Sequence, residues 1–448
     1  MEFLCYLLWC IIVFYITIWF VRKYFKKSLI SILSYTVVMQ MIIPLLMMYP
    51  FAFSKKNIVS TGMWYYNYLP HLNTVLFISI LGIIFFFLGV ILSNSSSKPV
   101  YKLQNNIASS FLTLSKSNGL ILIGTLVVTL FLFLLSNGSM FGEKGIRTFA
   151  MQNTSIRPIY NLLTSILPLA LGLTLINLIN DKRKILLWVL LITLLSIGLS
   201  TGSRTTVFSG VIFVVLTILF LRQKSKDILL TSVLTGSFFI VFLMYLSDIR
   251  TGQMNILVTL SGLYEKIFFG NTFSDFRDTA WIMAGWDGEL LFGKTQISGL
   301  LSFIPSSIFP FRSQWSLGVF TTSQVGLDSS IHPGLRPVIF GEAYFNFGVL
   351  GVISFSLIYG FIIGRISRFA NSILKSKEDI RLKRIKIFST FFMAELASNL
   401  MISAGFYYVY VTCFIIFLAY LAYNLKANIK EPKQILFERG SQSEGHNY

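Results

Sequence analysis

The chain has 448 residues, of which 54% are hydrophobic, and its mean hydropathy is +0.72. Charged residues make up only 12% of the chain, about half of the roughly 25% that soluble domains carry. This composition excludes a soluble globular protein and predicts an all-α polytopic membrane protein.

The formal net charge of +19 would suit a nucleic-acid ligand in a soluble protein. Most of the basic residues, however, lie in short segments between apolar runs, where anionic lipid head groups are the expected partners. We therefore predict contact with a lipid bilayer and no nucleic-acid partner. The three cysteines show no CxxC pattern and no ligand spacing with histidine, so we predict neither a metal site nor a cofactor.

Apolar runs long enough to cross the membrane recur along the chain, since a helix needs roughly 20 residues to cross about 30 Å of hydrocarbon. We predict about eleven spans, at 4–21, 29–51, 72–92, 119–137, 159–180, 185–200, 206–221, 228–247, 338–363, 386–404 and 406–425. The first run has no basic residues before it and a basic cluster after it, so we interpret it as a retained span and not as a cleaved signal peptide.

The distribution of Lys and Arg predicts the orientation of the spans. When the end of the first span is placed in the cytoplasm, about two thirds of the 37 Lys and Arg residues fall on the cytoplasmic side. The amino terminus is then outside and the carboxyl terminus is cytoplasmic.

This topology divides the chain into spans one to eight in residues 1–247, an outer loop in 248–337, spans nine to eleven in 338–425 and a polar cytoplasmic tail in 426–448. Loops as long as the one between spans eight and nine are uncommon unless they carry function. We expect the catalytic chemistry in this periplasmic or extracellular loop, which we predict to contain short interfacial helices.

The outer segments hold more Arg than Lys, whereas the cytoplasmic segments hold more Lys than Arg. The planar guanidinium group of Arg can bind two phosphate oxygens at once, so this excess indicates a phosphate-bearing ligand outside. The candidate phosphate ligands are Arg204, in a short GSR turn, and Arg250, Arg277, Arg312 and Arg336 in the outer loop. Arg204 has an alternative interpretation, a helix-end side chain that reaches the lipid head groups.

Three residues are candidates for a general base, namely Asp275, His332 and Glu342. Asp275 begins a predicted helix that Ser274 would cap. A lone His is more often structural than catalytic. Glu342 lies just inside span nine, where a carboxylate needs a partner, and we favour Arg336 or Arg204 as that partner.

The aromatic residues of the outer loop are candidates for stacking against sugar rings. The candidate substrate-binding residues, besides Arg250, are Trp281, Trp286, Trp315, Tyr344 and Asn346.

Two further features have a structural interpretation. The segment 298–315 is apolar but short and broken by prolines, so we expect it to lie in the membrane interface. The glycines of span nine are expected to allow close helix packing. They are Gly341, Gly348, Gly351, Gly360 and Gly364.

The GSR turn, the large outer loop with Arg and Trp, and the run H-P-x-L-x-P-x-x-x-G-E-x-Y-x-N-F-G from His332 resemble the bacterial O-antigen and capsule repeat-unit polymerases of the Wzy type. The resemblance covers roughly residues 120–425 and is specific in 201–206 and 271–351. It implies that the functional outer arginines correspond to Arg204 and to Arg277, Arg312 and Arg336.

The resemblance further implies a polyprenyl-pyrophosphate-dependent glycosyltransferase that is inverting and independent of metal. Such an enzyme moves a growing glycan from undecaprenyl pyrophosphate onto a new lipid-linked repeat unit, at the outer face of the bacterial cytoplasmic (inner) membrane. Its products are lipopolysaccharide or capsule chains. The implied partners are undecaprenyl-pyrophosphate-linked oligosaccharides and a chain-length regulator.

Two alternatives stay open at this point. An O-antigen ligase-type glycan transferase would use the same donor, so the arginines do not separate it from a polymerase. A flippase or exporter of lipid-linked oligosaccharide is the alternative from a different class. The enzyme is favoured because the charged residues gather at the outer surface and because no internal repeat typical of many transporters is found.

Overall fold

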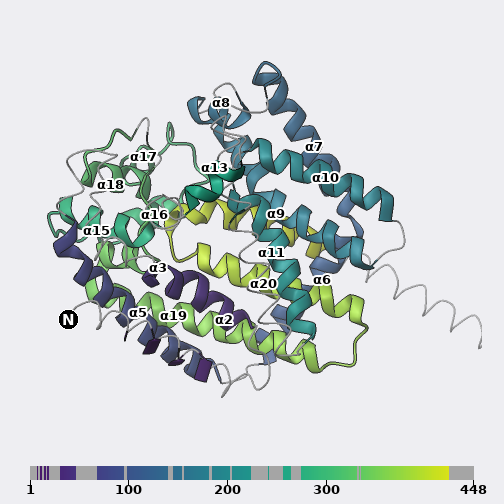
Figure 1. The fold of residues 1–448 in the computed structure, drawn as a ribbon, viewed down its shortest axis with the longest axis horizontal. Coiled ribbons are helices and arrows are strands. Elements are labelled where there is room, and N and C mark those ends of the chain that lie inside the picture. The colour runs from purple at the N-terminus through teal and green to yellow at the C-terminus, as the bar shows by residue number, and fades with distance from the viewer. Residues whose placement is uncertain are drawn as a thin grey trace, which may run out of the picture.

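The computed structural model describes residues 31–46, 68–94, 98–139, 145–153, 156–180, 184–201, 204–222, 256–263, 274–329, 332 and 334–422, with isolated residues 8, 11, 12, 15, 16, 18, 19 and 241. All regular elements in these ranges are helices (Figure 1). Five of them are long and apolar enough to span a membrane, at Leu72–Leu92, Asn118–Leu135, Arg157–Asn180, Gly341–Lys375 and Ser403–Ala422. The prediction of an all-α polytopic membrane protein is confirmed at this level.

The helices agree closely with the predicted apolar runs. α5 (Leu72–Leu92) has the predicted bounds, and α9 (Arg157–Asn180) and α11 (Arg204–Arg222) differ from theirs by about two residues at most. Three further predicted runs are matched by α2 (Ile32–Val37) with η1 (Val38–Ile42) and α3 (Ile43–Leu46), by α7 (Asn118–Leu135) and by α10 (Lys184–Ser200). The bounds differ more for the last two, since α19 (Gly341–Lys375) ends 12 residues beyond the predicted end and α20 (Ile380–Asn399) begins six residues before the predicted start. The runs 4–21 and 228–247 lie outside the described ranges, so the count of eleven spans stays a prediction.

One long helix was not predicted. α6 (Lys98–Lys116) occupies a segment that we expected to be a simple cytoplasmic connection. Its buried Phe111 packs edge-to-face against Phe388 and Phe392 of α20. A search for continuous apolar runs overlooks such a helix, because its apolar residues recur only on one face.

α5 and α19 form the most extensive helix pair in the described part, and Figure 1 shows them running alongside each other. A β-carbon at Gly360 would overlap the carbonyl oxygen of Phe86, and one at Gly89 would overlap that of Leu357. The two backbones therefore approach to a distance that only glycine permits. The packing role predicted for Gly360 is confirmed.

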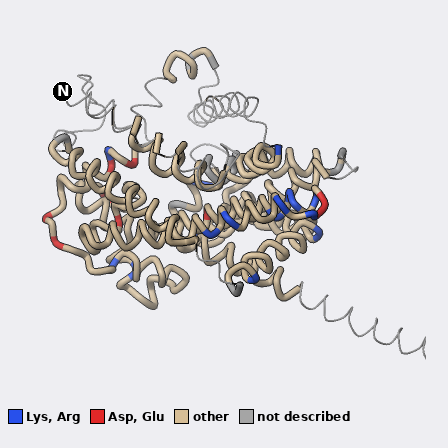
Figure 2. The backbone as a smooth tube through the Cα atoms, turned by 90° about the horizontal axis from the view of Figure 1, so that it is seen from below, with Lys and Arg blue, Asp and Glu red and all other residues tan. Residues whose placement is uncertain are grey.

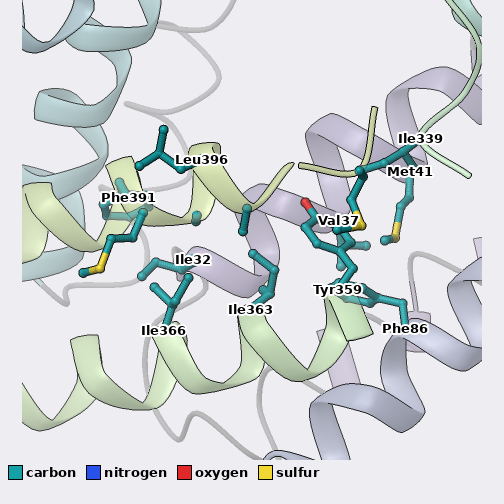
Figure 3. Packing of buried hydrophobic residues seen from close by; sticks show 14 of the residues in the cluster. Ile32, Val37, Met41, Phe86, Ile339, Tyr359, Ile363, Ile366, Phe391 and Leu396 are labelled. Atoms are coloured by element: carbon teal, nitrogen blue, oxygen red, sulfur yellow. The ribbon is translucent and has the colours of Figure 1, made fainter. Parts of the chain in front are cut away.

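The centre of the bundle is an apolar cluster contributed by α2, α5, α19 and α20 (Figure 3). Ile32, Phe86, Ile363 and Phe391 are among its fully buried side chains. Tyr359 is equally buried, and its hydroxyl is hydrogen-bonded to the hydroxyl of Ser398 at 2.5 Å. The Tyr359 hydroxyl thus has a hydrogen-bond partner although apolar side chains surround it, as buried polar groups generally do.

Gly348 has a different role from the packing that we predicted. Its backbone is left-handed, with φ 61° and ψ −148°, and it interrupts α19 seven residues after the helix begins. The carbonyl oxygens of Phe345 and Asn346 are thereby freed from the helix, and they accept the backbone N–H groups of Leu291 and Phe292 at 3.0 and 2.9 Å. Glycine is needed here because L side chains rarely adopt this conformation.

Short helices fill the segment between α11 and α19. They are α13 (Ile256–Ser261), α15 (Asp275–Gly285), α16 (Lys294–Leu300), α17 (Phe311–Gln314) and α18 (Leu317–Gln324). In Figure 1, α15 to α18 gather at one end of the bundle, where α15 packs on α5 and α16 packs on α19. Figure 2 shows Lys and Arg concentrated toward the opposite end.

Candidate functional site

The structure brings four of the predicted site residues, Asp275, Arg277, Arg312 and Arg336, into two groups. The α15 group comprises Ser274, Asp275, Arg277, Asp278 and Arg336. The α17 group comprises Arg312 and two residues that we did not single out in the sequence, Arg157 and Tyr407.

Arg277 and Asp278 form a buried ion pair in the first turn of α15. Asp278 Oδ1 accepts hydrogen bonds from Arg277 Nε and Nη2 at 2.9 and 2.7 Å, and both residues are less than 5% exposed. Ser274 occupies the predicted N-cap position, but its hydroxyl donates to Asp278 Oδ2 at 2.7 Å, so the predicted side-chain cap is wrong. Because Asp278 engages Arg277 and solvent scarcely reaches it, this guanidinium group is poorly placed for a ligand.

Asp275, two residues before Arg277 in the same helical turn, faces Arg336. Arg336 Nη2 lies 3.2 Å from Asp275 Oδ1, with 57% of the Arg336 side chain and 32% of the Asp275 side chain exposed. Burial raises the pKa of Asp275 to about 6, Asp278 contributes in the same direction, and Arg336 and Arg277 partly counteract them. A carboxyl group with a pKa near the working pH is well matched to general-base catalysis.

Glu342 is fully buried at the start of α19. Its Oε1 accepts the hydroxyl of Thr295 at 2.6 Å, and its Oε2 accepts the backbone N–H of Ser403 at 2.7 Å. Asn346 Nδ2 donates to the same Thr295 oxygen at 2.7 Å. Of the two predicted partners, Arg336 is wrong, since Arg336 pairs with Asp275, whereas the Arg204 side chain lies outside the described residues. Glu342 instead connects α16, α19 and the first residue of the last described span, Ser403–Ala422.

Arg312 belongs to α17 and is half-buried. Its Nη1 donates to the carbonyl oxygen of Ile304 at 2.6 Å, and its own carbonyl accepts the Ser298 hydroxyl at 3.0 Å. Burial lowers the pKa of Arg312 and the positive charge of Arg157 lowers it further, whereas Tyr407 acts in the opposite direction. Neither Arg312 nor Arg157 has a carboxylate partner within the described ranges.

Arg204 is the first residue of α11, which packs along α9. The hydroxyl of Tyr160, one turn after Arg157 in α9, donates to the carbonyl oxygen of Thr201 at 2.6 Å. Thr201, the residue that follows α10, therefore contacts the first turn of α9. The structure does not describe the Arg204 side chain, nor any part of Gly202, Ser203 and Arg250.

The aromatic candidates differ in accessibility. Trp281 is 6% exposed and belongs to the apolar core. Trp286 is half-buried, packs edgewise on Tyr344 and Phe345, and donates through Nε1 to the carbonyl oxygen of Glu289 at 2.9 Å. The ring of half-buried Trp315 lies below the Lys294 ammonium group, 4.1 Å from it. Of the three indoles, only Trp286 and Trp315 are partly exposed.

Two remaining predictions concern His332 and the segment 298–315. His332 is half-buried, and its Nδ1 accepts the N–H of Gly334 at 3.2 Å, which stabilises a turn. Phe303 and Ile308 expose 65% and 72% of their area, as expected of a segment lying in the membrane interface.

Among the described residues, no cluster of three or more His, Cys, Asp or Glu side chains could hold a metal ion.

Sequence reasoning missed Arg157, Tyr407, Thr295 and Ser403. None of them belongs to a recognisable motif, and each was singled out only because it contacts or interacts with a residue that is distant in the sequence. Ser403, for example, reaches Glu342 through its backbone N–H across 61 positions. The basic charge of Arg157 in an outer loop was the only available signal.

Comparison with known proteins links the chain to one family. The family model for the O-antigen polysaccharide polymerase Wzy matches residues 1–274, which is more than half of the chain. The match includes the GSR turn and ends just before α15, so it does not extend to the motif that begins at His332. No curated protein and no solved structure matches the chain. The resemblance inferred from the sequence is confirmed, and the chain belongs to the O-antigen polysaccharide polymerase Wzy family.

Proposed function

We propose that the protein polymerises undecaprenyl-pyrophosphate-linked oligosaccharide repeat units on the outer side of the bacterial cytoplasmic membrane. Membership of the Wzy family and the long apolar helices support a membrane-embedded polymerase of polysaccharide synthesis. The proposed reaction is an inverting glycosyl transfer that needs no metal. The observation that carries it is Arg312, a half-buried cation whose charge no described carboxylate neutralises.

Arginine side chains would stabilise the leaving group. As the bond between the anomeric carbon and the pyrophosphate oxygen breaks, negative charge develops on the pyrophosphate. Fixed donors placed at that oxygen favour the transition state over the ground state. Arg312 and Arg204 are the proposed donors, since Arg312 has no carboxylate partner among the described residues and Arg204 belongs to the GSR turn within the family match.

Asp275 is the proposed general base. As the acceptor hydroxyl attacks the anomeric carbon of the donor, Asp275 would take up its proton, and the glycan would move from its carrier onto the new repeat unit. The pKa of about 6 and the partial exposure of Asp275 support this role. Glu342 is enclosed and engaged by Thr295 and Ser403, which favours a positioning role for it.

The distribution of charge supports the orientation. Lys and Arg concentrate at the end of the bundle away from α15 to α18 (Figure 2). Under the positive-inside rule, that end faces the cytoplasm and α15 to α18 face outward. The carboxyl terminus would then be cytoplasmic and the amino terminus external, with a chain-length regulator as a candidate partner outside.

A gel of surface glycan from cells that lack the gene tests this function. A polymerase leaves a single repeat unit on an intact anchor, because flipping and ligation continue without polymerisation. Polymer retained on the lipid carrier would instead indicate the ligase, and unpolymerised repeat units held inside the cell would indicate the flippase. Either of these results would overturn the proposal.

A further inference from the structure

Two buried threonines lie against the segment that carries Arg336. Thr279 belongs to α15 and Thr321 to α18, and both are fully buried. The Thr321 hydroxyl accepts the backbone N–H of Leu335 at 2.9 Å, and the Thr279 hydroxyl accepts the backbone N–H of Val338 at 2.7 Å. The segment is therefore attached to one short helix just before Arg336 and to another just after it.

Thr279 joins the two sides of the Asp275–Arg336 ion pair through a single oxygen atom. Besides accepting from Val338, its hydroxyl donates to the carbonyl oxygen of Asp275 at 2.6 Å, one turn earlier in α15. A hydroxyl group can donate once and accept as well, so the two hydrogen bonds are compatible. Pro337, which separates Arg336 from Val338, has no N–H group, so Val338 supplies the first backbone donor after Arg336.

The position of the Arg336 guanidinium group determines how strongly it acts on Asp275. Burial raises the pKa of Asp275 to about 6, and the positive charge of Arg336 counteracts part of this rise. The Arg336 side chain is 57% exposed, and an exposed ion pair loses free energy in holding long side chains in one geometry. A backbone that is fixed beside the carboxylate reduces this loss.

We propose that Thr279 is a positioning residue that holds Arg336 beside the carboxylate of Asp275. This assignment rests on the proposed function, in which Asp275 is the general base. Thr279 is fully buried, so it would act on the reaction only through the Asp275–Arg336 pair. Its hydroxyl would thereby help to set the pH above which the base is active.

The other charged groups around Asp275 stay the same when Thr279 is changed. Arg277 and Asp278 act on Asp275 from its own helix. Of the described elements that pack on α15, α3, α5 and α18 contribute no charged side chain, and η4 (Leu69–His71) contributes His71. A change in the titration of Asp275 on loss of the Thr279 hydroxyl is therefore assigned to Arg336.

The test compares Thr279→Val with Thr322→Val in the purified full-length protein. Valine has nearly the size of threonine and lacks the hydroxyl, so Val338 loses its acceptor. Thr322 is the matched control, because it is a fully buried threonine of α18 whose hydroxyl donates only to the carbonyl oxygens of Gly318 and Val319 in its own helix.

The measured quantity is the midpoint pH at which Asp275 ceases to be labelled by a water-soluble carbodiimide and an amine, followed by mass spectrometry. The carbodiimide reacts with the protonated carboxyl group, and 32% of the Asp275 side chain is exposed to it. We expect Thr279→Val to raise this midpoint by about 0.5 pH units, the effect of weakening one partly exposed ion pair. Thr322→Val should leave the midpoint unchanged, and Thr279→Ser, which keeps the hydroxyl, should restore the wild-type value.

A double variant separates positioning from a general loss of structure. The midpoint of Thr279→Val combined with Arg336→Gln should equal that of Arg336→Gln alone, because no guanidinium group is left to hold. A general loss of structure would add a second shift. An unchanged midpoint in Thr279→Val, an equal shift in Thr322→Val, or additive shifts in the double variant would overturn the assignment.

The outcomes also separate this inference from the proposed function, because labelling requires no turnover. If Thr279→Val shifts the labelling midpoint but not the midpoint of the polymerisation rate, Thr279 positions Arg336 and Asp275 fails as the general base. If the wild-type protein polymerises lipid-linked repeat units and Thr279→Val is labelled as the wild type is, only the role of Thr279 fails.

Discussion

Asp275 is the residue whose chemistry the structure defines most clearly. Its carboxyl group is partly enclosed, faces Arg336 at 3.2 Å and has a pKa raised to about 6. A general base must be deprotonated before it can accept a proton, so the rate should increase as the pH rises through about 6 and then level off. Asp275→Asn, which cannot be deprotonated, should lower kcat about 100-fold or more.

The pH at which the rate reaches half of its maximum depends on Arg336. Because Arg336 lowers the pKa of Asp275, Arg336→Gln should move the midpoint to a higher pH. The measurement is the initial rate of polymer formation between pH 5 and pH 9, approximately the range in which such a base titrates. A midpoint that stays in place in Arg336→Gln would show that Asp275 is not the group that titrates.

At the scale of single residues, the sequence predicted which residues belong to the site better than it predicted which of them form ion pairs. Asp275, Arg277 and Arg336 were all named, yet the sequence did not reveal that Arg277 is neutralised by its neighbour Asp278 while Arg336 reaches Asp275. Adjacent residues in a helix normally point in different directions, so nothing in the spacing indicates that Arg277 folds back onto Asp278. Partnerships of this kind depend on the tertiary arrangement.

At the scale of elements, the buried contact of Glu342 connects α16 to α19. Thr295→Ala would remove the hydroxyl that bonds Glu342 Oε1, leaving a buried carboxylate oxygen without that donor. We expect a loss of about 1–3 kcal/mol of stability, seen as a lower thermal unfolding midpoint in detergent. Thr193→Ala is the control, since Thr193 bonds only to the Val189 carbonyl within its own exposed turn. Equal midpoints for the two variants would contradict the structural role of Glu342.

The contact between α5 and α19 gives a second prediction at this scale. Gly360→Ala would place a β-carbon on the carbonyl oxygen of Phe86, forcing two backbones apart. Overpacking of this kind costs about 1–3 kcal/mol, so the unfolding midpoint should fall. Gly124→Ala should not lower it, because a β-carbon at Gly124 meets nothing within 4 Å. A stable Gly360→Ala protein would mean that the two helices are less closely packed than described.

Helix prediction succeeded where apolar length was the signal and failed where it was not. The bounds of α5 follow directly from a continuous apolar run, whereas α6 was missed because its apolar residues recur on one helical face only. The break at Gly348 was also missed. A glycine in a helix has the same letter whether it allows close packing, as Gly360 does, or adopts a left-handed conformation, as Gly348 does.

At the scale of the whole molecule, two arginine-containing groups lie among the short helices α15 to α18 and the helix ends that contact them. In the proposed mechanism they divide the reaction. The α17 group would hold the diphosphate that leaves, and the α15 group would activate the hydroxyl that attacks. In this division, Arg336 has a carboxylate partner because it adjusts the pKa of Asp275. Arg312 has no carboxylate partner in the described ranges, so its positive charge can act on the diphosphate.

The family match and the predicted motif cover different parts of this assembly. The Wzy model accounts for residues 1–274, including Arg157 and the turn of Arg204, whereas Asp275, Arg312 and Arg336 lie beyond it. The sequence therefore predicted the family and the membrane character correctly. The contact between Pro158 and Tyr407 required the fold, because no local pattern joins the two residues.

The most direct test is product analysis with the purified protein, a lipid-linked repeat unit and excess EDTA. The account predicts a ladder of lipid-linked oligomers from the wild-type protein without any divalent cation. It also predicts about 100- to 1000-fold less product from Arg312→Lys, because a lysine cannot bind two phosphate oxygens as the guanidinium group does. A ladder that appears only when a divalent cation is added, or a full ladder from Arg312→Lys, would contradict the account.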